Sequence, residues 1–528
     1  MRDGAFGSYR ERCECEIRGH AQGFNMLIQN SSSWQPAFSD VLEKRYFQYF
    51  RHKTVASTNS LMNSRFWDRI VLQMCHVEPA VRHAVLALSS LHQLSEARRD
   101  DPSVALSHQR YADQHYYQAL GAAQSLLQSS GAEDIDRVLI TCLVFTCYEN
   151  VRGNYAASQL HTSSGRSIMA QHRERLSRLS RRNDLNEIQQ LFARLDIGAL
   201  AFSPSSSPYP YDIASFYATS PNLIPDAFDT IEDARAPLID HIRWSLVIRR
   251  IDLATVLQDP TLFALLESDR SKVAEHLTLW SARFEELAAR DCNASPILIR
   301  TLRIWHQLVS IDVVANWYGS ELRYDAHVAQ YEHLVSTAEE IIELLAQKPD
   351  RGAFSFDLGI TIPLFATAER CRDPYIRRRA LEAMHAGPRQ EGTWGPGAAL
   401  AAEKWVTFEE QGLGHVEKAS DIPEWRRIRN MDASINVDSG TADVLFEVTP
   451  SIGHEEELAL GFLGSTRLDE EGASAPVKPF SMGFGLTMSY SARFASDPED
   501  LMFMSEDDGT FAAAAAAAAA AVVEPLML

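Results

Sequence analysis

The sequence predicts an all-α protein, an extended multi-helical bundle or array with a small β-hairpin after the helical body and a disordered acidic C-terminal tail. Nearly four hundred residues after position 36 carry apolar side chains at helical spacing. Residues 433–448 then alternate around Asp438-Ser439-Gly440, which favours a hairpin. Beyond about residue 463 the chain is rich in Gly, Ser and Asp and ends near ten alanines, a composition typical of disorder.

The predicted helices follow in chain order from the apolar periodicity and its breakers. After Glu78-Pro79, for example, the proline suits a first helical turn, where its missing N–H costs nothing. Val81, Val85 and Leu88 then begin a single apolar stripe. The predicted helices are 38–50, 64–75, 79–97, 103–129, 134–150, 152–171, 184–202, 226–257, 260–290, 294–318, 325–346, 358–370, 374–386 and 397–412.

Breaks in this pattern predict the domain organisation. Residues 1–36 form an irregular N-terminal segment, and residues 37–462 form the helical domain. The proline-rich stretch 203–211 must interrupt the helices and divides the domain into halves at about 37–202 and 226–412, with the hairpin at about 433–448. Residues 463–528 form a low-complexity acidic and poly-alanine tail.

Charge is distributed unevenly along the 528 residues. The formal charge of −20 argues against a protein that coats nucleic acid with its whole surface. Residues 431–528 hold 17 acidic against 3 basic residues and therefore account for −14 of that charge. An acidic tail on a nearly neutral body indicates an interaction segment.

Cysteine usage and apolar runs indicate a soluble intracellular protein. No CxxC pair occurs, so neither a disulfide framework nor a zinc module is supported. The first residues lack the apolar core of a signal peptide, and no run approaches the ~18–20 apolar residues that span a bilayer. The seven cysteines are Cys13, Cys15, Cys75, Cys142, Cys147, Cys292 and Cys371.

Catalytic signatures are missing, and we expect no catalytic, cofactor-binding or metal-binding residues. The nucleophile elbow, the zinc-protease motif, the phosphate loop and the dinucleotide fingerprint do not occur. The run His161-Thr162-Ser163-Ser164-Gly165 lies in a helical pattern, where hydroxyls usually bond back to the backbone. The histidines and the pair Cys142 and Cys147 suit structural roles.

Two basic clusters are open to two interpretations. One lies just past a predicted helix, and Arg377, Arg378 and Arg379 lie inside another. Either cluster can contact phosphates or an import receptor, or it can be a solvated helix face with salt bridges. The first cluster, a candidate basic patch, consists of Arg173, Arg175, Arg178, Arg181 and Arg182.

The tail contains a candidate activation segment at Leu501, Met502, Phe503 and Met504. Acidic residues flank these apolar residues on both sides, so charge keeps the segment in water while its apolar side chains stay available to a shallow groove on a partner. The alternative is a disordered tail without a role.

The stretch 354–395 resembles the C-terminal part of the fungal-specific transcription factor domain found in Zn2Cys6 (binuclear zinc cluster) regulators. Its apolar helix runs into Arg370-Cys371-Arg372-Asp373-Pro374, a basic helix follows, and Gln390-Glu391-Gly392-Thr393-Trp394 closes it. Four further stretches resemble the same family in the same order, so that the resemblance covers about 40–460. They are 66–93 with its Glu-Pro helix start, 142–165 with Tyr148-Glu149 and Arg152-Gly153-Asn154, 192–202 with Arg-Leu-Asp, and 321–331 with Tyr324-Asp325.

The resemblance implies an all-α nuclear regulator that acts on transcription, often of secondary-metabolite or catabolic genes. Members bind DNA as dimers through an N-terminal zinc cluster, whereas residues 1–36 supply only Cys13 and Cys15. We therefore expect no zinc ligands here and DNA contact only indirectly or through an N-terminal module. The expected partners are transcription machinery, another regulator or a second copy, with no membrane. The alternatives are a non-catalytic scaffold or metabolite-binding protein, or an enzyme with an unrecognised site.

Overall fold

The computed structural model describes the chain from residue 38 to residue 493, apart from short gaps and three longer ones at 173–181, 203–223 and 449–479. From residue 430 onward it describes the backbone alone. Residue contacts divide the chain into the units Met1–Arg45 and Tyr46–Leu528. In the first unit the described part is residues 38 and 40 and the start of α2 (Val41–Tyr49).

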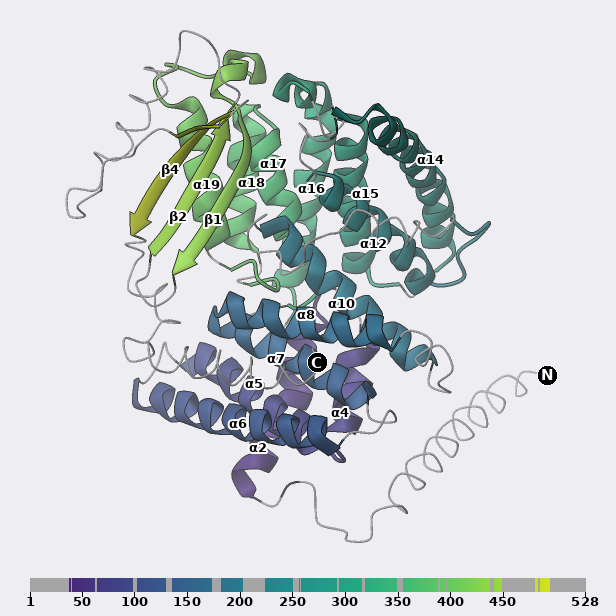
Figure 1. Cartoon of the computed structure of the whole chain (residues 1–528), viewed down its shortest axis with the longest axis vertical. Helices are drawn as coiled ribbons and strands as arrows, with labels where there is room; N and C mark the ends of the chain where they lie inside the picture. Colours follow the sequence, from purple (N-terminus) through teal and green to yellow (C-terminus); the bar gives the residue numbers. More distant parts are fainter. Residues whose placement is uncertain are drawn as a thin grey trace. The chain divides into compact units, whose positions relative to one another are not determined.

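The second unit begins with short helical turns and a set of longer helices (Figure 1). Helix α7 is buried along almost its whole length, as its apolar sequence predicts, and it packs against α5 and α8. These elements are the π-helical turn η1 (Phe50–Thr54), α3 (Val55–Thr58), the π-helical turn η2 (Phe66–Ile70), α4 (Val71–Met74), α5 (Pro79–Ala97), α6 (Pro102–Ser129), α7 (Ile135–Arg152), α8 (Tyr155–Gln171) and α10 (Arg182–Phe202).

Two residues specify the turn between α7 and α8, and a third sets the packing of α8. Gly153 has a φ of +78°, which a side chain would strain. Asn154 then caps α8, because its side-chain oxygen accepts the backbone N–H of Ala157 at 3.4 Å. Further along α8, a Cβ at Gly165 would stand 2.2 Å from the ring of Phe192. Only glycine therefore lets α8 approach α10 so closely.

A second group of helices follows from residue 231 onward and shares one large apolar core. Helix starts carry the expected caps: Thr230 and Asp233 form a capping box, and Asp259 and Asp373 each precede a proline at the first helical turn. These helices are α12 (Ile231–Ile248), α14 (Pro260–Arg290), α15 (Pro296–Ala315), the 3₁₀ turn η3 (Glu321–His327), α16 (Val328–Ala346), α17 (Thr361–Arg370), α18 (Pro374–Ala386), α19 (Gly397–Glu410) and the short 3₁₀ turns η4 (Ala419–Asp421) and η5 (Glu424–Arg426).

Contacts across residues 203–223 join the two groups of helices. The rings of Trp67 and Phe356 lie 5.4 Å apart, and the indole N–H of Trp394 donates to the carbonyl of Gly198 at 2.9 Å. Helix α10 contacts both α8 and α12 (Figure 1). The buried side of α10 therefore connects the earlier helices to the later ones.

A four-stranded antiparallel sheet follows the helices, with strand order β1-β2-β4-β3. Strands β1 (Ile428–Asn436) and β2 (Thr441–Val448) form the hairpin predicted around 433–448. Strands β3 (Phe480–Met482) and β4 (Gly485–Arg493) also belong to it, and β4 pairs with β2 along its whole length. Strands β3 and β4 lie within the stretch beyond about residue 463 that the sequence analysis assigns to the tail, and they complete the sheet.

The predicted all-α class is confirmed, and most predicted helices lie within three residues of the observed bounds. The largest differences are at 226–257, where α12 is shorter, and at 38–50, where the helical stretch continues through η1 and α3 to Thr58. At 325–346 the first turn is 3₁₀. Within the described residues, no helix combines the length and the hydropathy needed to cross a membrane.

Candidate functional site: a polar groove and three buried carboxylates

The sequence-predicted site residues lie mostly outside the described part of the chain. The candidate activation segment Leu501–Met504 is outside it, as are Arg173, Arg175, Arg178 and Arg181 of the basic patch. Arg182 is the first residue of α10. The structure therefore neither brings these residues together nor separates them.

The second basic cluster is ion-paired in the structure. Arg377 is fully buried and contacts the carboxylates of Glu409 and Glu410. Arg378 donates to Glu410 at 2.8 Å, and Arg379 donates to Glu339 at 2.6 Å and 3.0 Å. Of the two interpretations of this cluster, the salt-bridge interpretation is the one that the geometry supports.

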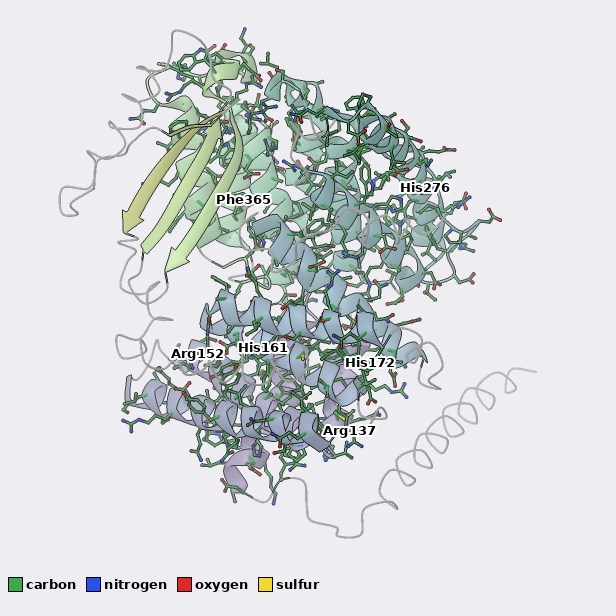
Figure 2. All side chains as sticks on the ribbon, in the orientation of Figure 1. Arg137, Arg152, His161, His172, His276 and Phe365 are labelled. Carbon is green, nitrogen blue, oxygen red and sulfur yellow. The ribbon has the colours of Figure 1, made fainter. Side chains whose placement is uncertain are left out.

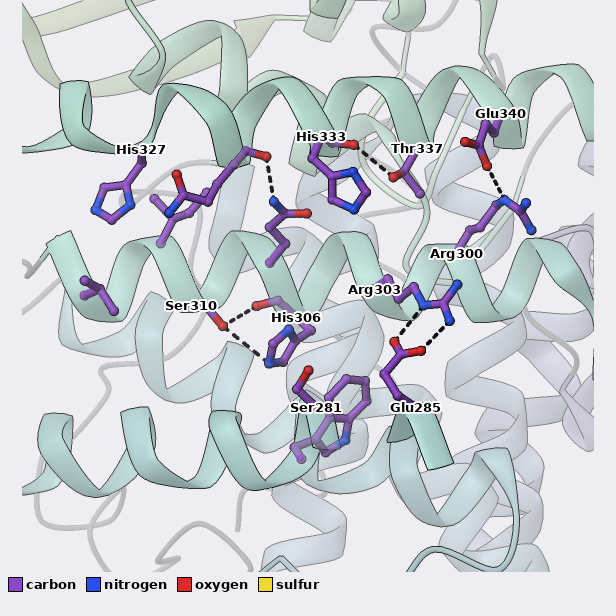
Figure 3. A pocket seen from close by; sticks show the side chains of 15 residues that line it. Ser281, Glu285, Arg300, Arg303, His306, Ser310, His327, His333, Thr337 and Glu340 are labelled. Atoms are coloured by element: carbon purple, nitrogen blue, oxygen red, sulfur yellow. Dashed lines mark hydrogen bonds and ion pairs between the residues drawn. The ribbon is translucent and has the colours of Figure 1, made fainter. Parts of the chain in front are cut away.

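A groove of about 660 Å³ runs along α15 between α14 and α16 (Figure 3). Two ion pairs link α15 to its neighbours at one end, from Arg300 to Glu340 at 2.6 Å and from Arg303 to Glu285 at 2.5 Å. The remaining lining is mostly uncharged and polar, with one exposed apolar side chain. These lining residues include Ser281, Gln307, Ser310, Val314, Gln330 and Thr337.

Three histidines also line the groove. His306 lies against the indole of Trp280, with ring centroids 5.0 Å apart, and its Nε2 lies 2.9 Å from the carbonyl of Leu277. Burial lowers the pKa of both His306 and His327, so both imidazoles are neutral at pH 7. With balanced ion pairs and neutral imidazoles, the groove suits a polar uncharged surface rather than a strongly charged ligand.

The first buried carboxylate is Glu149, on α7, which lies beside Tyr116 of α6 and His161 of α8. Figure 2 labels His161 and Arg152 among these helices. The Tyr116 hydroxyl donates to Glu149 and lies 3.3 Å from His161 Nε2. Burial raises the pKa of Glu149 to about 7, although the Tyr116 hydroxyl and Arg152 oppose the shift. Burial also lowers the pKa of His161 to about 4.

The second buried carboxylate, Glu321, lies at the start of η3 among guanidinium groups. Arg370 and Arg372 donate to its Oε2 at 2.8 Å and 3.2 Å, and Arg323 lies 3.4 Å from Oε1. Burial by itself raises the pKa, but the three arginines together lower it to about 2. The same network contains Glu409, whose carboxylate accepts from Arg372, Arg377 and the backbone N–H of Ile428 at the start of β1.

The third buried carboxylate, Glu391, lies in the segment Gln390–Trp394 and caps the start of α17. Its two oxygens accept the backbone N–H groups of Ile360 at 3.0 Å and Thr361 at 2.8 Å. Burial raises its pKa to about 7, and these N–H groups oppose that shift. In the same segment, Gln390 donates to the carbonyl of Asn150 at the end of α7. The segment Gln390–Trp394 therefore bonds to the end of α7 in the earlier group of helices and to the start of α17 in the later group.

The described cysteines do not fit a zinc cluster. Cys75, Cys142, Cys147 and Cys371 are buried as single free thiols, and burial raises the pKa of each, to about 12 for Cys142 and Cys371. A zinc ligand must be a thiolate, so raised pKa values oppose metal binding. Cys13, Cys15 and Cys292 lie outside the described residues.

The sequence predicted neither the groove nor the three carboxylates as sites. Glu149, Glu321 and Glu391 lie within the stretches that carry the family resemblance, so a signal for their importance existed. Apart from Arg323, which is two residues from Glu321, the hydrogen-bond partners described above lie 30 to 51 residues away along the chain, a distance that local patterns do not reveal.

Residues 45–246 match the family model described as "Fungal specific transcription factor domain". This part of the chain is therefore similar to a fungal-specific transcription factor domain. The matched range covers α5 to α10 and most of α12, so Glu149 lies inside it, whereas Glu321, Glu391 and the groove lie beyond it.

Two curated relatives of this chain are regulators by name. The chain is 23 % identical over 317 residues to the aspercryptin biosynthesis cluster-specific transcription regulator atnN of Emericella nidulans, covering 57 % of this chain and 50 % of that protein. It is 33 % identical over 145 residues to the transcription regulator lscL of Purpureocillium lilacinum, covering 26 % of this chain and 33 % of that protein. The chain thus matches half or less of each relative's length, and no solved structure matches it.

Proposed function

We propose that this protein is a transcriptional regulator of the fungal Zn2Cys6 type that controls a biosynthetic or other metabolic gene set. The observation that carries the proposal is the fungal-specific transcription factor domain at residues 45–246. The similarity to atnN, a cluster-specific regulator by name, supports the choice of a biosynthetic gene set. A deletion strain should lose transcripts of a limited group of genes, and an unchanged transcriptome would contradict the proposal.

The proposed role is non-enzymatic and nuclear, with DNA contacted indirectly or through an N-terminal module. Two observations support a non-enzymatic role: both relatives are regulators by name, and the buried carboxylates bond to neighbouring protein groups. We further propose residues 37–462 as the regulatory body, extended by β3 and β4, with transcription machinery, another regulator or a second copy as its partner.

The tail is proposed to activate transcription through Leu501, Met502, Phe503 and Met504. Joined to a foreign DNA-binding domain, the chain should activate a reporter, and replacing these four residues with alanine should abolish most of the signal. Alanine at Val522 and Val523 is the matched control. Equal reporter activity in the two variants would contradict the role of the segment.

The basic patch is proposed to contact an import receptor or phosphates. Glutamine at Arg173, Arg175, Arg178, Arg181 and Arg182 should lower the nuclear fraction of a fluorescent fusion. Glutamine at Arg300 and Arg303, which are ion-paired at the groove, is the control. Unchanged nuclear accumulation in the first variant would remove the import role.

A scaffold or metabolite-binding protein is the second candidate function, favoured by the polar groove along α15. In that case, purification under mild conditions should retain a bound partner or small molecule, and Ser310→Trp should release it by filling the groove. If deletion of the gene alters the transcriptome but Ser310→Trp does not, the result would favour a transcriptional regulator whose function does not need this groove.

A further inference from the structure

One face of α10 presents buried polar groups that the rest of the described structure does not satisfy. Gln190, Arg194 and Gly198 recur every four residues, about 6 Å apart along the helix, and therefore share a face. The Thr393 hydroxyl lies against this face, 3.7 Å from the point where a Cβ on Gly198 would stand. Among the described residues, Gln190 Oε1, Arg194 Nη1 and Nη2, and Thr393 Oγ1 are buried without a hydrogen-bond partner.

Arg194 lies in a buried cluster of two guanidiniums and two carboxylates. Its Nε lies 2.6 Å from Asp357 and its Nη2 lies 3.7 Å from Glu187, but Glu187 is also 3.8 Å from the buried Arg235. Burial lowers the pKa of Arg194, Asp357 opposes this, and the neighbouring Arg235 lowers it further. Two buried guanidiniums therefore share two carboxylates, and Nη1 of Arg194 has no hydrogen-bond partner among the described residues.

Unsatisfied buried groups are rare because each one costs free energy. Two such residues on one face of α10, with Thr393 opposite them, therefore indicate a missing partner. Nη1 and Nη2 of Arg194 have no hydrogen-bond partner among the described residues, although Nη2 lies 3.7 Å from Glu187, and such donors suit anionic oxygens. Gln190 Oε1 can only accept a hydrogen bond and therefore needs a donor such as a hydroxyl, whereas the Thr393 hydroxyl can donate or accept one.

We propose that this face of α10 binds a small hydroxylated anion, with carboxylate or phosphate oxygens on Arg194 and a hydroxyl on Gln190. The site lies where α10 meets Thr393 and Asp357, between the helices before residue 203 and those after residue 224. Binding there stabilises the arrangement of the two helix groups. The inference does not depend on the transcriptional role, because binding is measured on the isolated chain.

Thermal unfolding of the full chain tests the proposal, with inorganic phosphate and malate as probes at ionic strength held constant by sodium chloride. Each probe should raise Tm in a saturable manner, since a ligand of the native state stabilises it. Sulfate carries no hydroxyl donor at neutral pH and should bind at least about five-fold more weakly, the effect of one lost hydrogen bond. No saturable rise with either probe overturns the proposal.

Thr393→Val keeps the shape of the side chain and should weaken both probes about five-fold while leaving the unliganded Tm nearly unchanged. Arg194→Met should abolish binding of both probes. If that variant does not fold, the affinity of Thr393→Val for the probes decides whether the site exists. Thr278→Val is the matched control, because the Thr278 hydroxyl bonds to its own helix at Ala274. Equal affinities in Thr393→Val and wild type, or ordered water alone at these atoms in a phosphate-soaked crystal, would overturn the assignment.

Discussion

Glu149 and Glu321 are both almost fully buried, at 1 % and 2 % exposure, yet their pKa values shift in opposite directions. The main polar neighbours of Glu149 are the Tyr116 hydroxyl and the Asn154 side chain, and Arg152 makes its 2.6 Å ion pair with Asp113 instead. Three arginines contact Glu321, and one of them, Arg372, is shared with Glu409. Burial penalises the charge in both places, and the number of nearby guanidiniums decides which protonation state the fold prefers.

The consequence is that the two regions respond to pH with opposite signs. Glu149 has a folded pKa of about 7, so its contribution to stability is complete below its unfolded pKa of 4.5 and is lost as pH rises toward 7. Glu321 has a folded pKa of about 2, so its contribution is complete above 4.5 and is lost as pH falls toward 2.

The largest expected effect comes from Glu321→Gln. Removing one partner of a buried ion pair leaves Arg370 and Arg372 without full compensation, and it should lower the free energy of unfolding by about 3–5 kcal/mol at pH 7. Urea denaturation measures this. Glu340→Gln, at the half-exposed pair with Arg300, is the control and should cost less than about 1 kcal/mol. Equal losses in the two variants would show that the Glu321 network is dispensable.

Glu149→Gln should give the next largest effect and sharpen the contrast. The amide oxygen can still accept from Tyr116, but it cannot ionise. The variant should therefore match wild type near pH 4 and gain roughly 1–3 kcal/mol over it by pH 8, since each pKa unit corresponds to about 1.4 kcal/mol. Unfolding curves at pH 4, 6 and 8 measure the difference, and a gain that does not grow with pH would refute the raised pKa.

Glu391 extends the comparison, because it lacks guanidinium partners and is held by helix N–H groups. A Cβ at Gly359 would lie 2.2 Å from its carboxylate, so Gly359→Ala should displace Glu391 and cost about 1–3 kcal/mol. Gly121 is exposed on α6 with open space around it, and Gly121→Ala should stabilise the protein by up to about 1 kcal/mol. Thermal unfolding of both variants measures this, and destabilisation by Gly121→Ala would invalidate the control.

Helix positions could be predicted from the sequence because the signals are local. Pro79, Asp373-Pro374 and the apolar run of α7 each specify their own element. The buried charges could not be predicted, since a run such as Arg377–Arg379 reads as a surface and its carboxylate partners lie at positions 339, 409 and 410. Strand β4 was missed for the same reason, because its partner β2 ends 37 residues earlier in a segment without helical periodicity.

The pairing of β4 with β2 determines where this protein can be shortened. A truncation at residue 462, the end that composition alone suggests, would remove β3 and β4 and leave the edge of the eight-residue strand β2 that faces β4 without backbone partners. An open edge of that length recruits strands from other chains. Shortened versions that end at 462 should therefore form aggregates on gel filtration, whereas those that end just after Arg493 keep the edge covered.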